Sequence, residues 1–407
     1  MKHNKSEKGQ AIILIVVAIM GLLVLTALAV DGGMAYSERR QAQTSADSAA
    51  LDAGLAKVRG GDLATLVTEG MARAASNGFD NNGTDNIITI NNPPQDGCNG
   101  PSLYAGNDEY IQVIIRTVTK TYFGGVVGVN EVSNCVDAVA RAVPGTTAEM
   151  VYGNAVVSLA PSGCNRMWAH GNPDIDVVGG GIFTNSADPS CAFLQNGSGS
   201  ITAPSITVVG GASYSNGHVS PTPTTGAAAV PYPPFVLPNP TCSGTAQKSG
   251  NTLSPGTVNG NFPPNGVDAL NPGIYCVTGD FDLHGNATLT GSEVLIVMLN
   301  GTVTWNGNST ANLSGPTSGP FKGLLLYQPI TNTNVVTING TTSMQLTGSI
   351  LAPGATVRLL GTGDVNSFNS QVIGYEVEFG GTGNGTIRYD DDDNFDAAIP
   401  PQLELVE

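Results

Sequence analysis

The stretch AIILIVVAIMGLLVLTALAV, which begins at Ala11 and ends at Val30, contains no charged residue. At 1.5 Å per residue, a helix of this length covers the roughly 30 Å hydrocarbon layer of a bilayer. Lipid offers no partners for backbone polar groups, so a segment inside it must satisfy its own hydrogen bonds as a helix. We therefore predict a single transmembrane helix at residues 11–30.

Charges flank this segment unevenly. Before it come Lys2, Lys5 and Lys8, and after it come Asp31, Glu38, Arg39 and Arg40. The rule that basic residues stay inside favours a cytoplasmic segment at 1–10 and an extracellular or periplasmic location for the rest.

Two other interpretations of the apolar run remain. The tripeptide Ala27-Leu28-Ala29 resembles a signal-peptide cleavage site, but the run is longer than a usual signal core of 7–15 residues. A buried core helix is disfavoured because the run is apolar on every face. A retained membrane anchor fits better than either.

The helical pattern continues beyond the apolar run. Residues 37–58 contain no proline, and alanines recur there near helical spacing. Such a stripe of small residues lets another backbone approach closely. A second helix is expected at 62–75, ending at Asn77-Gly78. We predict that the membrane helix extends outward as a stalk.

Four short runs carry a resemblance: KGQAII from Lys8, AVDGGMAY from Ala29, RRQAQ from Arg39 and ADSAALDAG from Ala46. In this order they resemble the N-terminal part of Flp/Tad pilus-assembly proteins of the TadE/TadG-like kind. The resemblance covers about the first 60 residues. It implies a bacterial envelope protein with one membrane anchor that associates with Tad pilus or secretion components. The early Glu of ordinary type IV pilins is missing, which argues against processing by a prepilin peptidase.

Composition fits an exported, turn-rich β protein. The 407 residues include 53 Gly and 25 Pro, only 12% are charged, and the net charge is −16. Alternating apolar positions persist throughout, which favours strands over disorder. The acidic balance and the lack of a basic stripe argue against a nucleic-acid partner.

The six cysteines all follow residue 97. An even number in an exported chain favours disulfides, with fifteen possible pairings. Buried free thiols are the alternative. A zinc site is not indicated, because no two cysteines have C-x-x-C spacing. We expect sequential pairs because each then falls within one apparent module: Cys98 with Cys135, Cys164 with Cys191, and Cys242 with Cys276.

Residues 31–148 are expected to form a pilin-like α+β module. Strand patterns occupy 86–90, 110–118 and 136–143, and a short helix is expected within 121–127. These strands would pack on the long helix, as the family resemblance also implies.

Residues 149–390 have a different pattern, with β-type runs of about four residues separated by Gly- and Asn-rich turns. A parallel β-helix is preferred, and a β-sandwich of hairpins is the alternative. The segments 347–357 and 370–374 also loosely resemble solenoid-like regions of bacterial surface and pilus-associated proteins. We divide this region into a first β-rich part at 149–218, a Pro-rich linker or strap at 219–241, and a β-helix-like domain at 242–390.

Few residues suggest chemistry. The four histidines, His3, His170, His218 and His284, lack metal spacing, and no nucleophile elbow or Walker motif occurs. The weak calcium candidates are Asp390, Asp392 and Asp393, which head an acidic tail at 391–407 that is expected to fray.

Two pairs of acids and two aromatic residues are the remaining candidates. Alternate strand positions place Asp280 with Asp282, and Glu376 with Glu378, on shared faces. Possible binding aromatics are Trp305 and Tyr327, while Trp168 stands alone.

These patterns lead to one preferred function and two alternatives. We expect a non-enzymatic envelope protein of the Tad/Flp type, without a cofactor, that acts in scaffolding or adhesion through its β-rich domain. The alternatives are a membrane-anchored carbohydrate-active enzyme with a lyase-like β-helix, and an adhesin independent of pili. Membrane, pilus components and surface polysaccharide are the expected partners.

Overall fold

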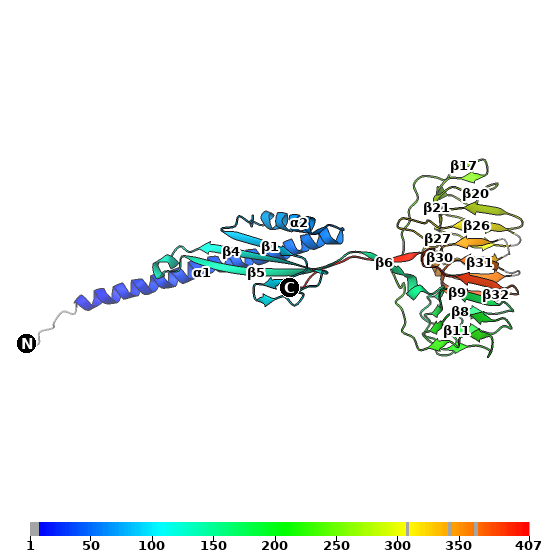
Figure 1. Cartoon of the computed structure of the whole chain (residues 1–407), viewed down its shortest axis with the longest axis horizontal. Helices are drawn as coiled ribbons and strands as arrows, with labels where there is room; N and C mark the ends of the chain where they lie inside the picture. Colours follow the sequence, from blue (N-terminus) through cyan, green and yellow to red (C-terminus); the bar gives the residue numbers. More distant parts are fainter. Residues whose placement is uncertain (1–7, 307–308, 341–343, 362–364, 407) are drawn as a thin grey trace, which may run out of the picture. The chain divides into compact units, whose positions relative to one another are not determined.

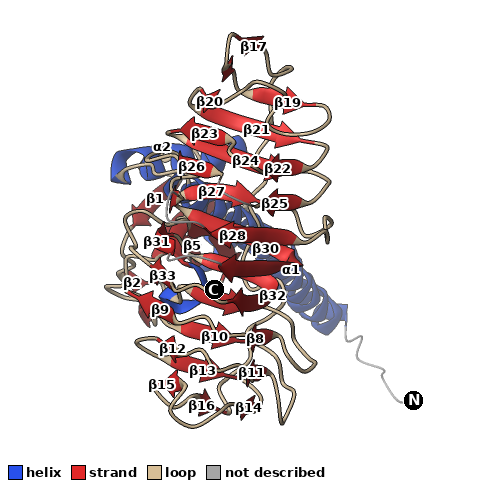
Figure 2. Cartoon of the chain, turned by 90° about the vertical axis from the view of Figure 1, so that its right-hand side faces the viewer, coloured by secondary structure: helices blue, strands red, loops and turns tan. Residues whose placement is uncertain are grey.

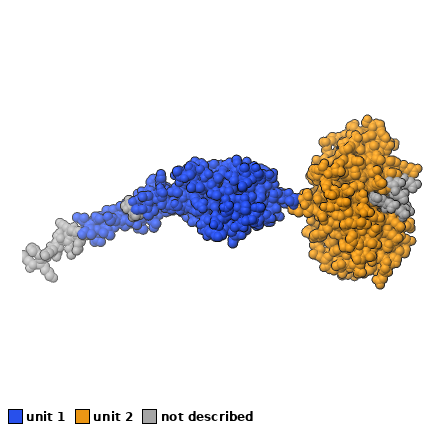
Figure 3. Space-filling view, in the orientation of Figure 1, with its two compact units in different colours: residues 1–146, 400–407 blue, residues 147–399 orange. Residues whose placement is uncertain are grey.

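The computed structural model describes residues 8–306, 309–340, 344–361 and 365–406, so Lys2, His3 and Lys5 lie outside the described residues. The chain forms two compact units, distinguished by colour in Figure 3. Unit 1 comprises residues 1–146 and 400–407, and unit 2 comprises residues 147–399. Unit 2 is therefore an insertion between two strands of unit 1.

Unit 1 is built on one unbroken helix, α1 (Lys8–Val58), which contains the whole apolar run and the predicted stalk (Figure 1). Its apolar part has a mean hydropathy of 3.1, and none of it is buried, so it is long and apolar enough to cross a membrane. The alanine stripe instead faces protein, since Ala42, Ala46, Ala49 and Ala53 are fully buried. The helix thus continues through the segment that we predicted as a stalk.

A four-stranded antiparallel sheet packs on the stalk. Its strands are β1 (Asn86–Asn91), β4 (Tyr110–Lys120), β5 (Glu131–Val143) and β35 (Gln402–Leu405). The helix α2 (Leu63–Ser76), the short pair β2 (Asp96–Gly97) and β3 (Gly100–Pro101), and the 3-10 turn η1 (Gly124–Val127) complete unit 1. Unit 1 therefore has an α+β arrangement, to which residues 400–407 at the end of the chain also contribute.

The C-terminal segment is ordered, and our expectation of a fraying tail is wrong. β35 pairs antiparallel with β5, with Leu403 opposite Ala142. Leu403 packs where Gly54 of α1 leaves room, because a Cβ on Gly54 would lie 2.6 Å from Leu403 Cδ1. Hydrogen bonding to the otherwise free edge of the sheet thus gives the acidic C-terminal segment a defined structure, which its composition alone does not predict.

Unit 2 is a coil of short strands in which every turn contributes to up to three ladders, here called faces 1, 2 and 3 (Figure 2). Face 1 runs β16 (Thr224–Thr225), β13 (Ile206–Val208), β10 (Ile182–Thr184), β7 (Val156–Ser158), β32 (Val372–Gly381), β30 (Ser349–Gly361), β27 (Leu324–Tyr327), β24 (Val294–Met298), β21 (Gly273–Val277) and β19 (Gly256–Val258). Face 2 runs β14 (Ala212–Ser213), β11 (Phe193–Gln195), β8 (Met167–Ala169), β32, β30, β28 (Val336–Gly340), β25 (Val303–Trp305) and β22 (Phe281–Leu283).

Face 3 completes each turn. It runs β15 (Val219–Ser220), β12 (Ile201–Thr202), β9 (Ile175–Val178), β33 (Gly385–Arg388), β31 (Val365–Asn369), β29 (Gln345–Thr347), β26 (Thr310–Ser314), β23 (Thr288–Gly291), β20 (Ala269–Leu270), β18 (Thr252–Leu253) and β17 (Lys248–Ser249). Apart from β17 with β18, the strand pairs of these faces in the described part of the chain are parallel, as between β24 and β21. β30 and β32 are long because each runs through faces 1 and 2 without a break.

The order of the turns differs from the order of the sequence. The last turn of the chain lies on the first: β32 pairs parallel with β7 and β8, and β33 pairs with β9. The chain therefore enters the coil in its middle, winds to one end at β16, and restarts at the other end near β19. The parts at 149–218 and 242–390, which we expected as separate regions, form one continuous stack.

The Pro-rich segment joins the two ends of this stack, and it acts as a strap. Val230, Tyr232 and Phe235 pack on an apolar surface of face 1 that includes Leu295 and Val297. This surface explains why β24, with the sequence VLIVM, is buried at every position, whereas β22 on face 2 alternates. The strap is shorter than predicted, because residues 219–225 supply β15 and β16 at the end of the stack.

The entry and exit of the coil lie side by side. β6 (Thr146–Glu149) pairs with β34 (Asp396–Ile399), and the turn η2 (Met150–Gly153) follows β6. The fully buried Gln371 side chain donates from Nε2 to the carbonyl oxygens of Asn154, at 2.8 Å, and Met150, at 3.3 Å. Asn394 Oδ1 in turn accepts the Gln371 backbone N–H at 2.7 Å. Gln371 thus ties the last turn to the segment that begins the first.

We predict that Gln371→Ala destabilises unit 2 by about 2 kcal/mol, because two buried carbonyl groups lose their donor. The only tryptophans of the chain, Trp168 and Trp305, both belong to unit 2, so their fluorescence in a urea titration reports its unfolding alone. The matched control is Gln345→Ala, at an exposed position of β29, which we expect to leave the midpoint unchanged. Equal midpoints for both variants would show that Gln371 does not hold the two turns together.

Candidate functional site

The outer side of face 2 carries a group of charged and aromatic side chains that contact one another. It forms where the last turn meets the first, since Glu378 of β32 lies between Arg358 of β30 and Trp168 of β8 in parallel register. Neighbouring strands in a sheet are about 4.8 Å apart, so such a row presents closely spaced side chains on a flat surface. We call the following set the charged ladder: Arg166, Trp168, His170, Arg358, Glu376 and Glu378.

Alternation along each strand creates this surface. In β8 and β32 the residues that flank the charged ladder, Met167 and Val377, point inward and are buried. Their neighbours must therefore point outward, because successive side chains of a strand alternate between the two sides of the sheet.

Glu378 is the centre of the charged ladder. Arg358 Nε donates to its Oε2 at 2.7 Å, and His170 Nε2 lies 2.8 Å from its Oε1. The Glu378 side chain is 14% exposed, so these contacts replace most of its hydration. Both carboxylate oxygens are thus engaged.

Glu376 is engaged in the same way one step along β32. Arg166 forms an ion pair with its Oε1, and Thr356 Oγ1 lies 3.3 Å from its Oε2. Arg166 Nε also donates to the carbonyl oxygen of Ser162 at 3.0 Å. The two acids that we predicted on a shared face are therefore brought together, but each is neutralised by an arginine.

Trp168 supplies an aromatic surface beside these charges. Its ring lies on the His170 ring, with centroids 4.1 Å apart and planes inclined by 31°. Its Nε1 donates to Asn196 Oδ1 at 3.2 Å, which fixes the orientation of the indole. Trp168 is only partly buried, so part of this residue is exposed to solvent.

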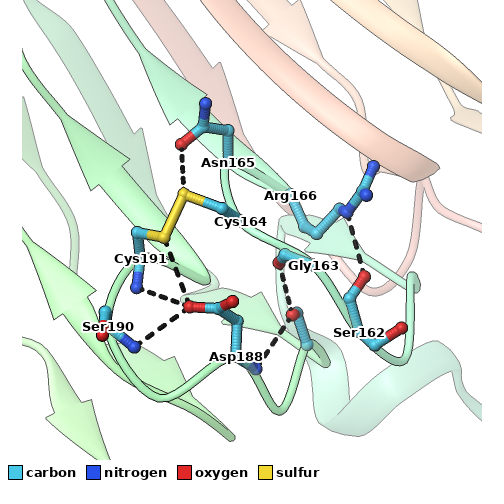
Figure 4. The surroundings of a disulfide bond; sticks show 9 residues. Ser162, Gly163, Cys164, Asn165, Arg166, Asp188, Ser190 and Cys191 are labelled. Carbon is cyan, nitrogen blue, oxygen red and sulfur yellow. Dashed lines mark hydrogen bonds between the residues drawn. A yellow bond between two sulfur atoms is a disulfide. The ribbon is translucent and has the colours of Figure 1, made fainter.

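The disulfide Cys164–Cys191 lies two residues before Arg166 in the segment that leads into β8 (Figure 4). It links the chain entering β8 to the chain entering β11, whose strands pair in parallel. Asp188 stabilises the turn before Cys191, because its Oδ1 accepts the backbone N–H groups of Ser190 and Cys191 at 3.0 and 2.9 Å. These two donors lower the pKa of the Asp188 carboxyl.

All three disulfides form as the sequence predicts: Cys98–Cys135, Cys164–Cys191 and Cys242–Cys276. The first lies in unit 1 and the other two in unit 2. Cys242–Cys276 fastens the end of the strap to β21.

The two aromatic residues that we proposed for binding do not lie on a surface, and that prediction is wrong. Trp305 is fully buried inside the coil, where its ring packs edge-on against Phe281 at 5.1 Å. Tyr327 points out from face 1 but is 4% exposed, within the apolar cluster that the strap also contacts. Burial raises the pKa of the Tyr327 hydroxyl.

The remaining acidic candidates serve local structure. Asp280 Oδ1 accepts the N–H of Thr302 at 2.8 Å, one turn along the coil. Asp390 Oδ1 accepts the N–H of Asp392, and its carbonyl oxygen accepts that of Asp393, both at 3.1 Å. Among the described residues, no three His, Cys, Asp or Glu side chains converge as a metal site would require. The calcium assignment therefore has no support from geometry.

Sequence reasoning set Trp168 aside and did not connect it with Glu378. Their sequence separation of 210 residues, from 168 to 378, leaves no local signal for the contact. The only hint was that Arg166, Trp168 and His170 alternate, as outward positions of a strand do.

Comparison with known proteins gives one match. Residues 9–57 match the family model described as putative Flp pilus-assembly TadE/G-like. This confirms the resemblance at the N-terminal part of the chain. No curated protein and no solved structure matches the chain.

We predict that the double variant Cys164→Ser/Cys191→Ser lowers the stability of unit 2 by about 3 kcal/mol, because a closure of 27 residues no longer restricts the unfolded chain. Tryptophan fluorescence in urea measures this shift. The control Cys98→Ser/Cys135→Ser removes a disulfide from unit 1 and should leave the tryptophan midpoint unchanged. An unchanged midpoint in the first variant would contradict the structural role of this bond.

Proposed function

We propose that the protein is a single-pass envelope component of the Tad/Flp pilus-assembly type, in which α1 anchors unit 1 and carries unit 2 outside the membrane. The observation that supports this most is the continuity of α1: one helix contains both the apolar run and the alanine stripe on which the sheet packs. The match of residues 9–57 covers the same helix. Because this helix is continuous, no flexible linker separates the proposed membrane segment from the folded part of unit 1.

The proposed orientation has the N-terminus in the cytoplasm. It is supported by the basic residues that precede the apolar run. The three disulfides are consistent with it, because such bonds form in oxidising compartments outside the cytosol.

We predict that protease added to the outside of intact cells or spheroplasts releases fragments from residues 60–407, because these residues lie beyond the bilayer. Immunoblotting with an antibody against unit 2 measures the loss. A cytoplasmic protein probed in parallel must stay intact. Complete protection of unit 2 in spheroplasts, with digestion only after lysis, would contradict the orientation. Co-purification with Tad pilus components from detergent-solubilised membranes tests the association.

We infer further that unit 2 is a parallel β-helix rather than a β-sandwich. Support comes from the repeated parallel pairing of equivalent strands, for example Val294–Met298 with Gly273–Val277. A sandwich of hairpins would pair consecutive strands antiparallel. Interior residues stack from turn to turn, as Phe262, Phe281 and Trp305 do.

For the ligand of unit 2, we infer that the charged ladder is an adhesive surface for a hydroxyl-rich polymer such as a surface polysaccharide. An aromatic ring beside fixed donors and acceptors matches such a ligand, because the ring contacts C–H groups and the polar groups bind hydroxyls. Arg358, Glu378 and Trp168 lie in one row across the sheet, and the His170 ring packs on that of Trp168. Because the row lies across the surface of a sheet, it could contact several units of an extended polysaccharide chain.

The same contacts support binding without catalysis. A carboxylate acting as general acid or nucleophile needs an oxygen free to reach the scissile bond. In Glu376 and Glu378 every carboxylate oxygen already contacts an Arg, His or Thr side chain. We therefore place the lyase-like alternative second.

We predict that Trp168→Ala weakens binding to a retained polysaccharide roughly tenfold, since exposed aromatic anchors often dominate a binding surface. The measurement is affinity electrophoresis or calorimetry over a panel of acidic and neutral polysaccharides. Tyr152→Ala is the matched control, because Tyr152 is 75% exposed on another part of unit 2.

Turnover separates adhesion from enzymatic activity on the same panel. We expect the polymer length to stay constant on incubation with the protein. Depolymerisation that is abolished by Glu376→Ala or Asp280→Ala would replace our proposal by the enzyme. Equal affinity of Trp168→Ala and the parent protein would exclude the charged ladder as the binding surface.

A further inference from the structure

We propose that the tip of the β4–β5 hairpin, residues 121–130, is a second membrane contact that lies in the lipid headgroup layer beside α1. This inference rests on the proposed membrane anchoring of α1. It adds a surface that neither the family match nor the apolar run identifies.

Asp31 fixes the level of the tip. It is the residue directly after the apolar run, and its side chain is turned toward protein, with the residue 8% exposed. Its Oδ1 accepts the N–H of Tyr122 at 2.9 Å, and its Oδ2 accepts the N–H groups of Phe123 at 2.9 Å and Gly124 at 2.6 Å. Three bonds to one carboxylate hold the tip at the point where α1 leaves the hydrocarbon layer.

The tip is also compact. Thr121 Oγ1 donates to the carbonyl oxygen of Val129 at 2.6 Å, and the Val129 N–H donates to that of Gly124 at 2.9 Å. A Cβ on Gly124 would lie 2.6 Å from the Val129 oxygen, so glycine is needed for this closure. Farther along the strand, Asn134 Nδ2 donates to the Ala35 carbonyl oxygen at 3.4 Å. The hairpin is thus held to α1 at two levels.

The tip exposes three large apolar or aromatic side chains. Tyr122 is 75% exposed, Phe123 38% and Val129 49%. Residues 121–130 contain no charged residue, whereas the loop at the other end of β4 includes Asp108 and Glu109. Exposed aromatic residues without charges are costly in water but are enriched where a membrane meets water.

The helix supplies a matching residue. Tyr36, which is 66% exposed, follows Val30 by six residues, or about 9 Å of helix. A headgroup layer is roughly 5–7 Å thick on each side, so the Tyr36 backbone lies just outside it, and a helical side chain leans back toward the N-terminus and hence toward this layer. The tip, which contacts Asp31, lies within that layer. Lipid is therefore a better occupant than a soluble partner, which would have to approach through the headgroups.

The experiment uses an added tryptophan as a depth probe. The full chain is reconstituted in phosphatidylcholine–phosphatidylglycerol vesicles with or without lipids brominated in the upper part of the acyl chains, and the quenching of the parent tryptophans is subtracted. We expect Tyr122→Trp to lose fluorescence and shift its emission to the blue. The matched control is Leu103→Trp, at a position 89% exposed at the far end of β4, which should not be quenched.

A third variant separates this inference from the membrane anchor. Leu23→Trp, in the middle of the apolar run, should be quenched by lipids brominated deep in the chain. Suppose that Leu23→Trp is quenched but Tyr122→Trp is quenched no more than Leu103→Trp. This result would overturn the lipid contact of the tip but would leave the membrane anchor intact. Absence of quenching in Leu23→Trp would overturn the anchor, and the tip inference with it.

The role of Asp31 has its own test. Asp31→Ala in the Tyr122→Trp background should reduce the quenching, because the tip is released from α1. Asp62→Ala, which removes the carboxylate that accepts the Thr65 N–H at the start of α2, is the control and should leave quenching unchanged. Equal quenching in all three backgrounds would show that Asp31 does not set the level of the tip.

Discussion

The parallel pairing of β32 with β7 and β8 is the contact on which unit 2 depends. It is made between segments more than 200 residues apart, and it converts two stretches of short strands into one stack. Strands of three residues cannot be stable alone, because each buries little apolar surface and few hydrogen bonds. Stacked on both sides, however, they contribute to a continuous interior. The buried Gln371 and Asn394 side chains reinforce this junction by bonding the first and last turns to each other.

The same junction explains the strap. A chain that starts in the middle of a coil and winds to one end must travel the length of the stack to fill the other end. The strap makes this passage over face 1, and its Val230, Tyr232 and Phe235 cover an apolar outer surface. Face 1 is consequently apolar on both sides, while face 2 keeps a polar outer side. The charged ladder exists on face 2 because the strap does not cover it.

Unit 2 is inserted within the sequence of unit 1. The chain leaves unit 1 after β5 and returns to pair with β5 through β35, so two chain segments connect the units. The β6–β34 pair marks the passage. Unit 1 in turn is fixed on α1 by the buried alanine stripe and by the bonds from Asp31 to the hairpin tip.

The sequence alone determined the features that depend on local pattern. These features are the apolar helix and its continuation, the strands of unit 1, the pattern of short strands in unit 2 and the three disulfides. They could be predicted because periodicity, charge and spacing are encoded within a few tens of residues. Only the tertiary structure decided which strands are neighbours, and hence that Trp168 meets Glu378, that Trp305 is interior and that the acidic C-terminus forms β35. Each of these follows from stacking or edge pairing between distant segments. Short strands of similar composition do not specify which distant strand they will pair with.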